Sequence, residues 1–158
     1  MTHSNVHLVE SFYTAFQRRD AAAMGACYAP TISFRDPVFV LEGWRVGAMW
    51  RMLCERGVDL RIEARNIQAD DTRGGAHWEA WYTFRATGRR VHNVIEAGFV
   101  FSGGRIVEHQ DRFDLHRWAG QALGLKGRLL GWTPPVQRAI RGQAARALDD
   151  FIRKHGLT

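Results

Sequence analysis

The residues HWEAWYTFRATGRRVHNVIEAGFVFSGGRIVEHQDRF, positions 77–113, decide the fold class of this chain. Apolar and polar side chains alternate along three runs of this stretch, which is typical of β-strands that bury one face. The glycine-containing segments TGRR and SGGR separate the runs and have the length of hairpin connections. The stretch therefore predicts three long antiparallel strands, and the alternation in VDLRIEA, 58–64, predicts another strand before them.

Helical spacing replaces this alternation on both sides of the strands. We expect helices over residues 4–20, 21–29 and 43–57, and again from Leu115 to the end of the chain. Ser4 or Asn5 can cap the first of these helices, and Asp20 can cap the second. Helices followed by a meander of strands are an α+β pattern, in which the helices cover one face of the sheet.

We therefore predict an α+β fold in which a curved antiparallel sheet wraps around the N-terminal helices. We expect one domain over residues 1–118 and a basic helical extension over 119–158 that packs on it. A curved sheet closed by helices leaves a concave, apolar-lined pocket, which is the usual shape of a small-molecule site.

The net charge of +6 is unevenly distributed along the 158 residues. Residues 1–115 contain 14 basic and 14 acidic side chains, whereas residues 116–158 contain 8 basic and 2 acidic ones. Residues 1–115 carry no net charge, and the sequence contains no nucleic-acid recognition motif, which together argue against nucleic-acid binding. Cys27 and Cys54 lack metal-ligand or redox spacing, and no secretory signal or membrane-spanning run is visible, so we expect a cytoplasmic protein with reduced cysteines.

The segment ISFRDPVF, 32–39, places one carboxylate, Asp36, among apolar residues. Burying a carboxylate is costly, so Asp36 needs an explanation. It either caps a turn before Pro37 or faces a cavity, where its proton affinity rises into a range useful for proton transfer.

Three segments, FYTAFQRRD (12–20), YAPTISFRDPVF (28–39) and GGRIVEHQDRFDL (103–115), together resemble the nuclear transport factor 2-like superfamily. The closer resemblance, over residues 4 to about 118, is to its SnoaL-like branch of polyketide cyclases, ketosteroid isomerases and limonene epoxide hydrolases. This resemblance implies a cone-shaped sheet around a long helix, with a deep cavity inside. It also implies that Asp36 is similar in position to the isomerases' general base. Asp111 resembles the acid/base aspartate of the cyclases and one acidic residue of the epoxide hydrolases.

The resemblance to the isomerases and the hydrolases is incomplete. Phe12 and Ala97 stand where the isomerases have their oxyanion-hole tyrosine and protonated aspartate, so a steroid isomerase of the usual kind is not expected. The strand HWEAWYTF, 77–84, lacks the Arg-x-Asp pair of the epoxide hydrolases.

The period of two assigns the side chains that face the cavity. We take Asp111, Asp36 and His109 as candidate catalytic residues. The candidate substrate contacts are Phe34, Trp78, Tyr82, Phe84, Phe99 and Phe113. His109 bonded to Asp111 as a purely structural pair is the alternative for these two residues. A metal site formed by the three candidates is not favoured, because they lack the short helical spacing of a typical site.

Two functions fit this arrangement. The first is an enzyme without metal or organic cofactor that performs acid/base chemistry, namely isomerisation, cyclisation or hydrolysis, on a hydrophobic, oxygen-bearing molecule. The second is a non-catalytic ligand-binding or scaffold domain of the same fold. We also expect a homodimer, because Trp81 lies beside Glu79 and Glu96 on the outer face of the strands.

The basic extension carries an apolar stripe at helical spacing, formed by Val136, Ile140, Ala144, Leu148 and Phe151. We expect this stripe to pack on the domain. The alternatives are a lid over the cone, a dimer contact, or attachment to an anionic membrane. Membrane attachment is not favoured, because residues 1–115 provide no second basic surface in the sequence.

Overall fold

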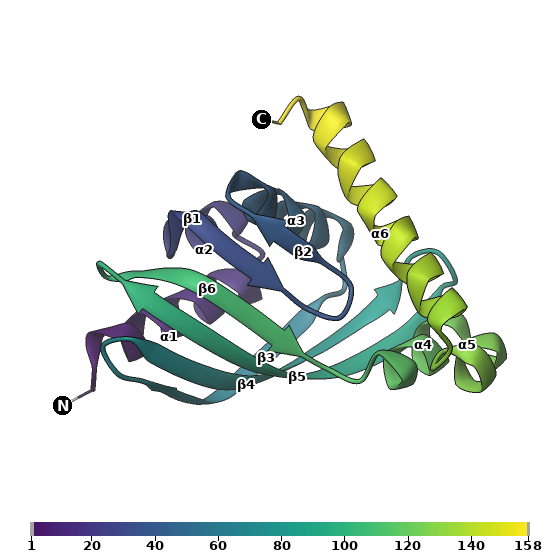
Figure 1. Cartoon of the computed structure of the whole chain (residues 1–158), viewed down its shortest axis with the longest axis horizontal. Helices are drawn as coiled ribbons and strands as arrows, with labels where there is room; N and C mark the ends of the chain where they lie inside the picture. The colour runs from purple at the N-terminus through teal and green to yellow at the C-terminus, as the bar shows by residue number, and fades with distance from the viewer. Residues whose placement is uncertain (1, 158) are drawn as a thin grey trace.

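The computed structural model describes residues 2–157 and contains a curved, open sheet with helices packed against it (Figure 1). The six strands lie in the order β2-β1-β6-β5-β4-β3. Their bounds are β1 Tyr28–Arg35, β2 Val40–Glu42, β3 Arg61–Ala69, β4 Arg73–Phe84, β5 Arg89–Ser102 and β6 Arg105–Arg112. The predicted strands within 77–113 are confirmed as β4, β5 and β6. The neighbours β1 and β6 are parallel, and all other neighbouring strands are antiparallel.

The helices are α1 Ser4–Gln17, α2 Ala21–Ala26, α3 Trp44–Arg56, α4 Leu115–Leu123, α5 Leu125–Leu130 and α6 Pro134–His155. Asp20 caps α2 as predicted, since its side chain accepts a hydrogen bond from Ala23 N at 3.0 Å. The predicted cap of α1 was wrong, because His3 is the N-cap and its Nδ1 accepts a hydrogen bond from Asn5 N at 3.0 Å. The second helix was predicted too long, because the chain enters the sheet at Tyr28.

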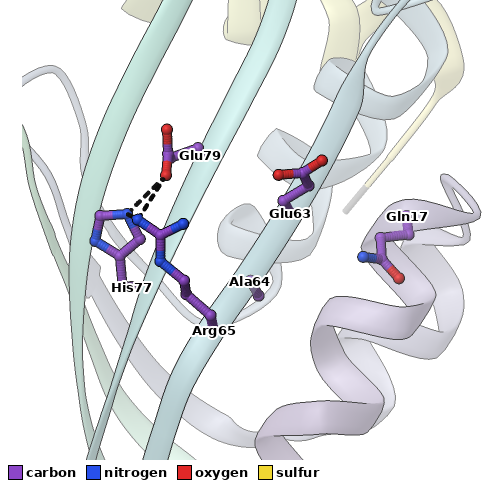
Figure 2. Close-up of a pocket in the computed structure, with 6 residues that line it drawn as sticks. All are labelled: Gln17, Glu63, Ala64, Arg65, His77 and Glu79. Atoms are coloured by element: carbon purple, nitrogen blue, oxygen red, sulfur yellow. Dashed lines mark hydrogen bonds and ion pairs between the residues drawn. The ribbon is translucent and has the colours of Figure 1, made fainter.

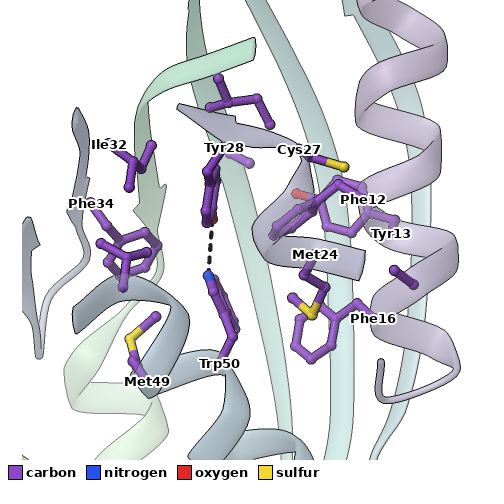
Figure 3. Packing of buried hydrophobic residues seen from close by; sticks show 14 of the residues in the cluster. Phe12, Tyr13, Phe16, Met24, Cys27, Tyr28, Ile32, Phe34, Met49 and Trp50 are labelled. Atoms are coloured by element: carbon purple, nitrogen blue, oxygen red, sulfur yellow. Dashed lines mark hydrogen bonds between the residues drawn. The ribbon is translucent and has the colours of Figure 1, made fainter. Parts of the chain in front are cut away.

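The main core lies between the inner face of the sheet and the helices α1 and α3. Phe12 and Phe16 of α1 pack against Trp50 of α3, with ring centroids 5.9 and 5.0 Å apart. Phe16 also contacts Trp78 of β4, at 5.4 Å. Figure 3 shows this aromatic packing together with the hydrogen bond between Trp50 and Tyr28. Cys27 and Cys54 are buried and free, as predicted for core cysteines.

A smaller apolar cluster joins the end of the sheet to the C-terminal helices. It consists of Val91 from β5 and of Leu115, Trp118, Ala119 and Ala122 from α4. The predicted boundary at residue 118 therefore falls inside a helix that packs on the sheet.

The long helix α6 runs from α4 and α5, along one side of the molecule, toward α3 (Figure 1). Its residues Leu148 and Phe151 are buried in the main core. Arg45 of α3 and Asp149 form an ion pair at 2.7 Å. Arg141 Nε donates a hydrogen bond to Pro37 O at 2.9 Å, so α6 also holds the connection between β1 and β2. None of the helices within residues 2–157 is both long and apolar enough to cross a membrane.

Candidate functional site

Two polar side chains lie at the centre of the inner face of the sheet. Ala97 pairs with Asp111 and Phe99 pairs with His109 in the register of β5 and β6. His109 is 1% exposed and Asp111 is 3% exposed. The alternation therefore assigned the inward direction of both residues correctly.

His109 is the middle member of a hydrogen-bonded chain that starts on α3. Trp50 Nε1 lies 2.9 Å from Tyr28 Oη, and Tyr28 Oη lies 2.7 Å from His109 Nδ1. An indole can only donate, so the tyrosine oxygen accepts from Trp50. A carboxylate can only accept, so a neutral His109 carries its ring proton on Nε2 toward Asp111, and the Tyr28 proton points to Nδ1. Nδ1 is then an acceptor, and the ring proton sits on Nε2, which donates to Asp111 Oδ1 at 2.9 Å. The chain fixes one tautomer of His109.

Asp111 receives both of its hydrogen bonds on one oxygen. Trp78 Nε1 donates to Oδ1 at 3.2 Å, in addition to His109. No side chain or backbone group of residues 2–157 bonds to Oδ2. Tyr13 is also buried, its hydroxyl has no partner among the described residues, and burial together with the Asp111 charge raises its pKa. The surroundings of Asp111 thus retain unused hydrogen-bonding capacity.

Asp36 lies in the connection between β1 and β2, where it caps the turn, as the first of the two sequence-based explanations states. Its Oδ1 accepts hydrogen bonds from Val38 N at 2.7 Å and from Phe39 N at 2.6 Å, so it caps the turn. Burial nevertheless raises the pKa of the carboxyl to about 6, against the opposing effect of these two bonds. The negative charge of Asp111 raises it further, and His109 lowers it. One oxygen therefore has a structural role, while the carboxyl as a whole titrates close to neutral pH.

Tyr82 of β4 is half-buried and lies within the electrostatic influence of Asp36. Burial raises the pKa of Tyr82, the hydrogen bond from Trp118 lowers it, and the charge of Asp36 raises it. Trp118 Nε1 donates to Tyr82 Oη at 2.7 Å, which leaves the phenol proton free to donate elsewhere. No described residue accepts this proton.

The sequence analysis missed Tyr28, Trp50 and Trp118. A signal existed for Tyr28, because it has the same parity as Phe34 and Asp36 along the strand. Trp50 and Trp118 lie on helices, and no pattern in the sequence indicates which strand residue their indole groups contact.

The interior in which the apolar-lined pocket was predicted is filled by aromatic side chains of the protein. The rings of Phe34 and Phe99 lie 5.1 and 4.5 Å from the ring of His109. Half-buried residues form an apolar rim where the main core meets the α4 cluster: Val38, Tyr82 and Phe113, with Phe84 beside them. The deep pocket therefore stays a prediction, and three residues of its predicted lining, Tyr82, Phe84 and Phe113, are half-buried at the rim.

Two hollows on the surface lie away from this rim. One, of about 240 Å³, runs along the β3 edge of the sheet, and Figure 2 shows Arg65 and His77 both directed at Glu79 in it. Glu79 Oε2 is 3.2 Å from Arg65 and 2.9 Å from His77. The other, of about 520 Å³, lies over α2 and α3. The first hollow is lined mostly by charged and polar side chains, so it does not suit an apolar ligand.

No group of three or more His, Cys, Asp or Glu side chains within residues 2–157 has the geometry of a metal site.

The family model of the SnoaL-like domain matches residues 9–109 of the chain. The match includes Asp36 and His109 and ends two residues before Asp111. No curated protein gives a significant match to this sequence.

Solved structures with the same fold are numerous. A proposed polyketide cyclase from Xanthomonas campestris is 24% identical, with a TM-score of 0.63 over 75% of this chain and 96% of its own. An LEH-like epoxide hydrolase from M. tuberculosis is 21% identical, with a TM-score of 0.62 over 82% of this chain and 98% of its own. A protein with a ketosteroid isomerase-like fold from Catenulispora acidiphila, bound to trimethylamine, is 14% identical. Its TM-score is 0.66 over 80% of this chain and 97% of its own. At these identities the similarity establishes the fold.

Proposed function

Because the chain belongs to the SnoaL-like domain family, we propose that it is a cofactor-independent enzyme for proton transfer on a hydrophobic, oxygen-bearing small molecule. The reaction that best suits its residues is removal of a proton from a carbon next to a carbonyl group. Isomerisation and cyclisation both begin with that step.

The observation that carries this proposal is the half-buried carboxyl of Asp36, whose charge also raises the pKa of Tyr82. A carboxyl group with a pKa of about 6 accepts a proton efficiently near neutral pH. Tyr82 offers a free phenol proton, and its oxygen is polarised by the hydrogen bond from Trp118 at 2.7 Å. Asp36 would take the proton from carbon, and Tyr82 would donate a hydrogen bond to the carbonyl oxygen as negative charge develops there.

We give the principal role to Asp36 and a supporting role to Asp111. Asp111 is 3% exposed and holds two hydrogen bonds on one oxygen, whereas Asp36 is half-buried at the rim. The charge of Asp111 raises the pKa of Asp36, and the chain through His109 and Tyr28 fixes the position of Asp111. Asp111 and His109 are therefore positioning residues in this proposal.

The proposed substrate would enter between the half-buried rim residues Val38, Tyr82, Phe84 and Phe113. This lining is apolar, with one carboxyl and one phenol, and it favours a flat, hydrophobic molecule with few oxygen atoms. Arg141 of α6 donates a hydrogen bond to Pro37 O, directly after Asp36, so α6 would help to position this side of the proposed entrance.

The test uses 2-tetralone, a flat bicyclic ketone, in D₂O. We expect the protein to accelerate the exchange of the protons next to the carbonyl, observed by ¹H NMR. Asp36→Asn should lower the protein-catalysed rate about 10²- to 10⁴-fold, the usual contribution of general acid/base catalysis. Tyr82→Phe should lower it about tenfold or more, because the hydrogen bond to the developing charge is lost.

Glu108→Gln is the matched control, since Glu108 is an exposed carboxylate on the outer face of β6. An Asp36→Asn protein as active as the Glu108→Gln protein would overturn the assignment of the base.

The second candidate is a binding domain without catalysis. The observation that favours it over catalysis is the packed interior, in which Phe34 and Phe99 lie against His109 and leave only the half-buried rim for a ligand. In that case 2-tetralone should raise the melting temperature of the protein without any exchange above the buffer rate.

A further inference from the structure

A group of large apolar side chains is exposed at the end of the molecule formed by α4 and α5. Four of the eight strongly exposed large apolar residues within 2–157 fall between positions 125 and 132. They are Leu125 at 68%, Leu129 at 62%, Leu130 at 46% and Trp132 at 63% exposure, and we call them the α5 tip. Figure 1 places α5 at the outer end of the molecule, beside α4 and the start of α6.

The glycines of α5 explain why these side chains point away from the protein. A Cβ on Gly127 would lie 1.9 Å from Ala119 O, and a Cβ on Gly131 would lie 2.7 Å from Ala119 Cβ. His116 Nε2 also donates to Arg128 O at 2.8 Å. The glycine side of α5 is therefore in close contact with α4, and the leucine side has no element of the domain to pack against.

The chain around the α5 tip is basic. No Asp or Glu occurs between Asp114 and Asp149, whereas this interval contains Arg117, Lys126, Arg128, Arg138, Arg141 and Arg146. Arg117, Lys126 and Arg128 are exposed and lie on α4 and α5 themselves. The same two helices that form the end of the molecule with the α5 tip therefore also carry exposed positive charges.

The β4–β5 hairpin adds a second basic segment at the same place. Thr87 Oγ1 donates to Ala122 O at 2.5 Å, and Arg89 Nε donates to Gln121 O at 2.8 Å. These bonds hold the hairpin, with its exposed Arg85, Arg89 and Arg90, against α4. The two hydrogen bonds join residues 35 and 32 positions apart in the chain. The sequence argument against membrane attachment, that the body of the domain offers no second basic surface, does not hold for this end of the molecule.

We propose that the α5 tip inserts into the headgroup region of a bilayer that contains anionic lipid, with the surrounding Arg and Lys side chains on the lipid phosphates. Aliphatic and tryptophan side chains ringed by cations are the composition of interfacial membrane anchors. Four side chains cover much less than the ~800 Å² per partner of a stable protein interface. The basic side chains suit the negatively charged lipid headgroups, and the apolar α5 tip suits the acyl-chain boundary beneath them.

The experiment is co-sedimentation of the full chain with vesicles of phosphatidylcholine, with and without phosphatidylglycerol. We expect binding to the anionic vesicles, little binding to the neutral ones, and a loss of binding at high salt because the charges are screened. Leu129→Asp and Trp132→Ala should each weaken the partition by about tenfold, since they remove apolar insertion. Arg85→Glu combined with Lys126→Glu should weaken it by a similar factor through charge alone.

Matched controls exist at exposed positions outside the α5 tip. Val40→Asp and Trp44→Ala change residues that are 70% and 49% exposed, and Arg18→Glu with Arg73→Glu repeats the charge reversal. These proteins should bind like the wild type. Equal sedimentation with both vesicle types, or unchanged binding by Leu129→Asp, would overturn the proposal. So would light scattering that shows a self-associated form lost on Leu129→Asp, because the tip would then serve a second copy of the chain.

Discussion

Asp36 shows how one side chain can have both a structural and a chemical role. Its Oδ1 holds the turn through two backbone hydrogen bonds, while burial raises the pKa of the carboxyl to about 6. The raised pKa means that the folded protein binds this proton more tightly than the unfolded chain does. The resulting stabilisation is fully present below the unfolded pKa of 3.8 and is lost as the pH rises through about 6.

Asp36→Asn removes this titration while keeping an oxygen that can accept the bonds from Val38 and Phe39. We expect the unfolding free energy of the variant, relative to the wild type, to be greater at pH 8 than at pH 4 by about 2 kcal/mol. Urea unfolding at the two pH values measures this difference, with Glu108→Gln as the control. A difference independent of pH would show that Asp36 is not the group that titrates.

For single residues, the sequence predicts which side of the sheet a side chain faces better than it predicts the hydrogen-bond partners of that side chain. The period of two correctly turned Asp111 and His109 inward, because backbone geometry alone sets that period. The chain from Trp50 through Tyr28 to His109 depends on where a helix is placed over the sheet. That placement is a tertiary property, so spacing along one element could not reveal it.

Among the elements, α6 connects the two apolar clusters. Ile140 packs against the smaller cluster near the proposed entrance, and Leu148 and Phe151 are buried in the main core. The sequence predicted this stripe from its helical spacing. It could not predict that Arg141 would bond to Pro37, because that contact joins residues 104 positions apart.

Leu148→Ala should lower the unfolding free energy by about 2–4 kcal/mol, because it leaves a cavity at a side chain with 0% exposure. Gln143→Ala, on the exposed side of the same helix, should change it by less than about 0.5 kcal/mol. Thermal unfolding followed by circular dichroism compares the two variants. Equal melting temperatures would mean that α6 does not stabilise the domain in solution.

At the scale of the whole molecule, the outer face of the sheet carries an aromatic stack and a group of charged side chains that the fold itself does not require. The ring of Trp81 stacks on His92 at 4.6 Å, and the Arg61 guanidinium carbon lies 4.2 Å from the centre of the Trp81 ring. Next to this stack, Glu79 accepts bonds from His77 and His92 at 2.9 and 2.7 Å. A flat aromatic stack beside paired charges is suited to a contact with a second copy of the chain.

We expect light scattering at micromolar concentration to give about twice the chain mass of 18.0 kDa. Trp81→Asp should reduce it to the mass of one chain, because a carboxylate cannot be buried there without a partner. Trp44→Asp, at an exposed position on α3, should leave the mass unchanged. A wild-type protein of single-chain mass would rule out this assembly.

The parallel pair β1 and β6 also determines the order in which the protein can be assembled during synthesis. Phe34 lies opposite His109 in this pair, and the two residues are 75 positions apart. The first strand therefore has no β6 neighbour until the last strand has left the ribosome, and its pairing edge stays unsatisfied during that time. The hairpins from β3 to β6 close over short loops and can form first, so the N-terminal segment joins a sheet that already exists. The residues around Asp36, which begin the chemistry in our proposal, are then among the last to reach their final positions.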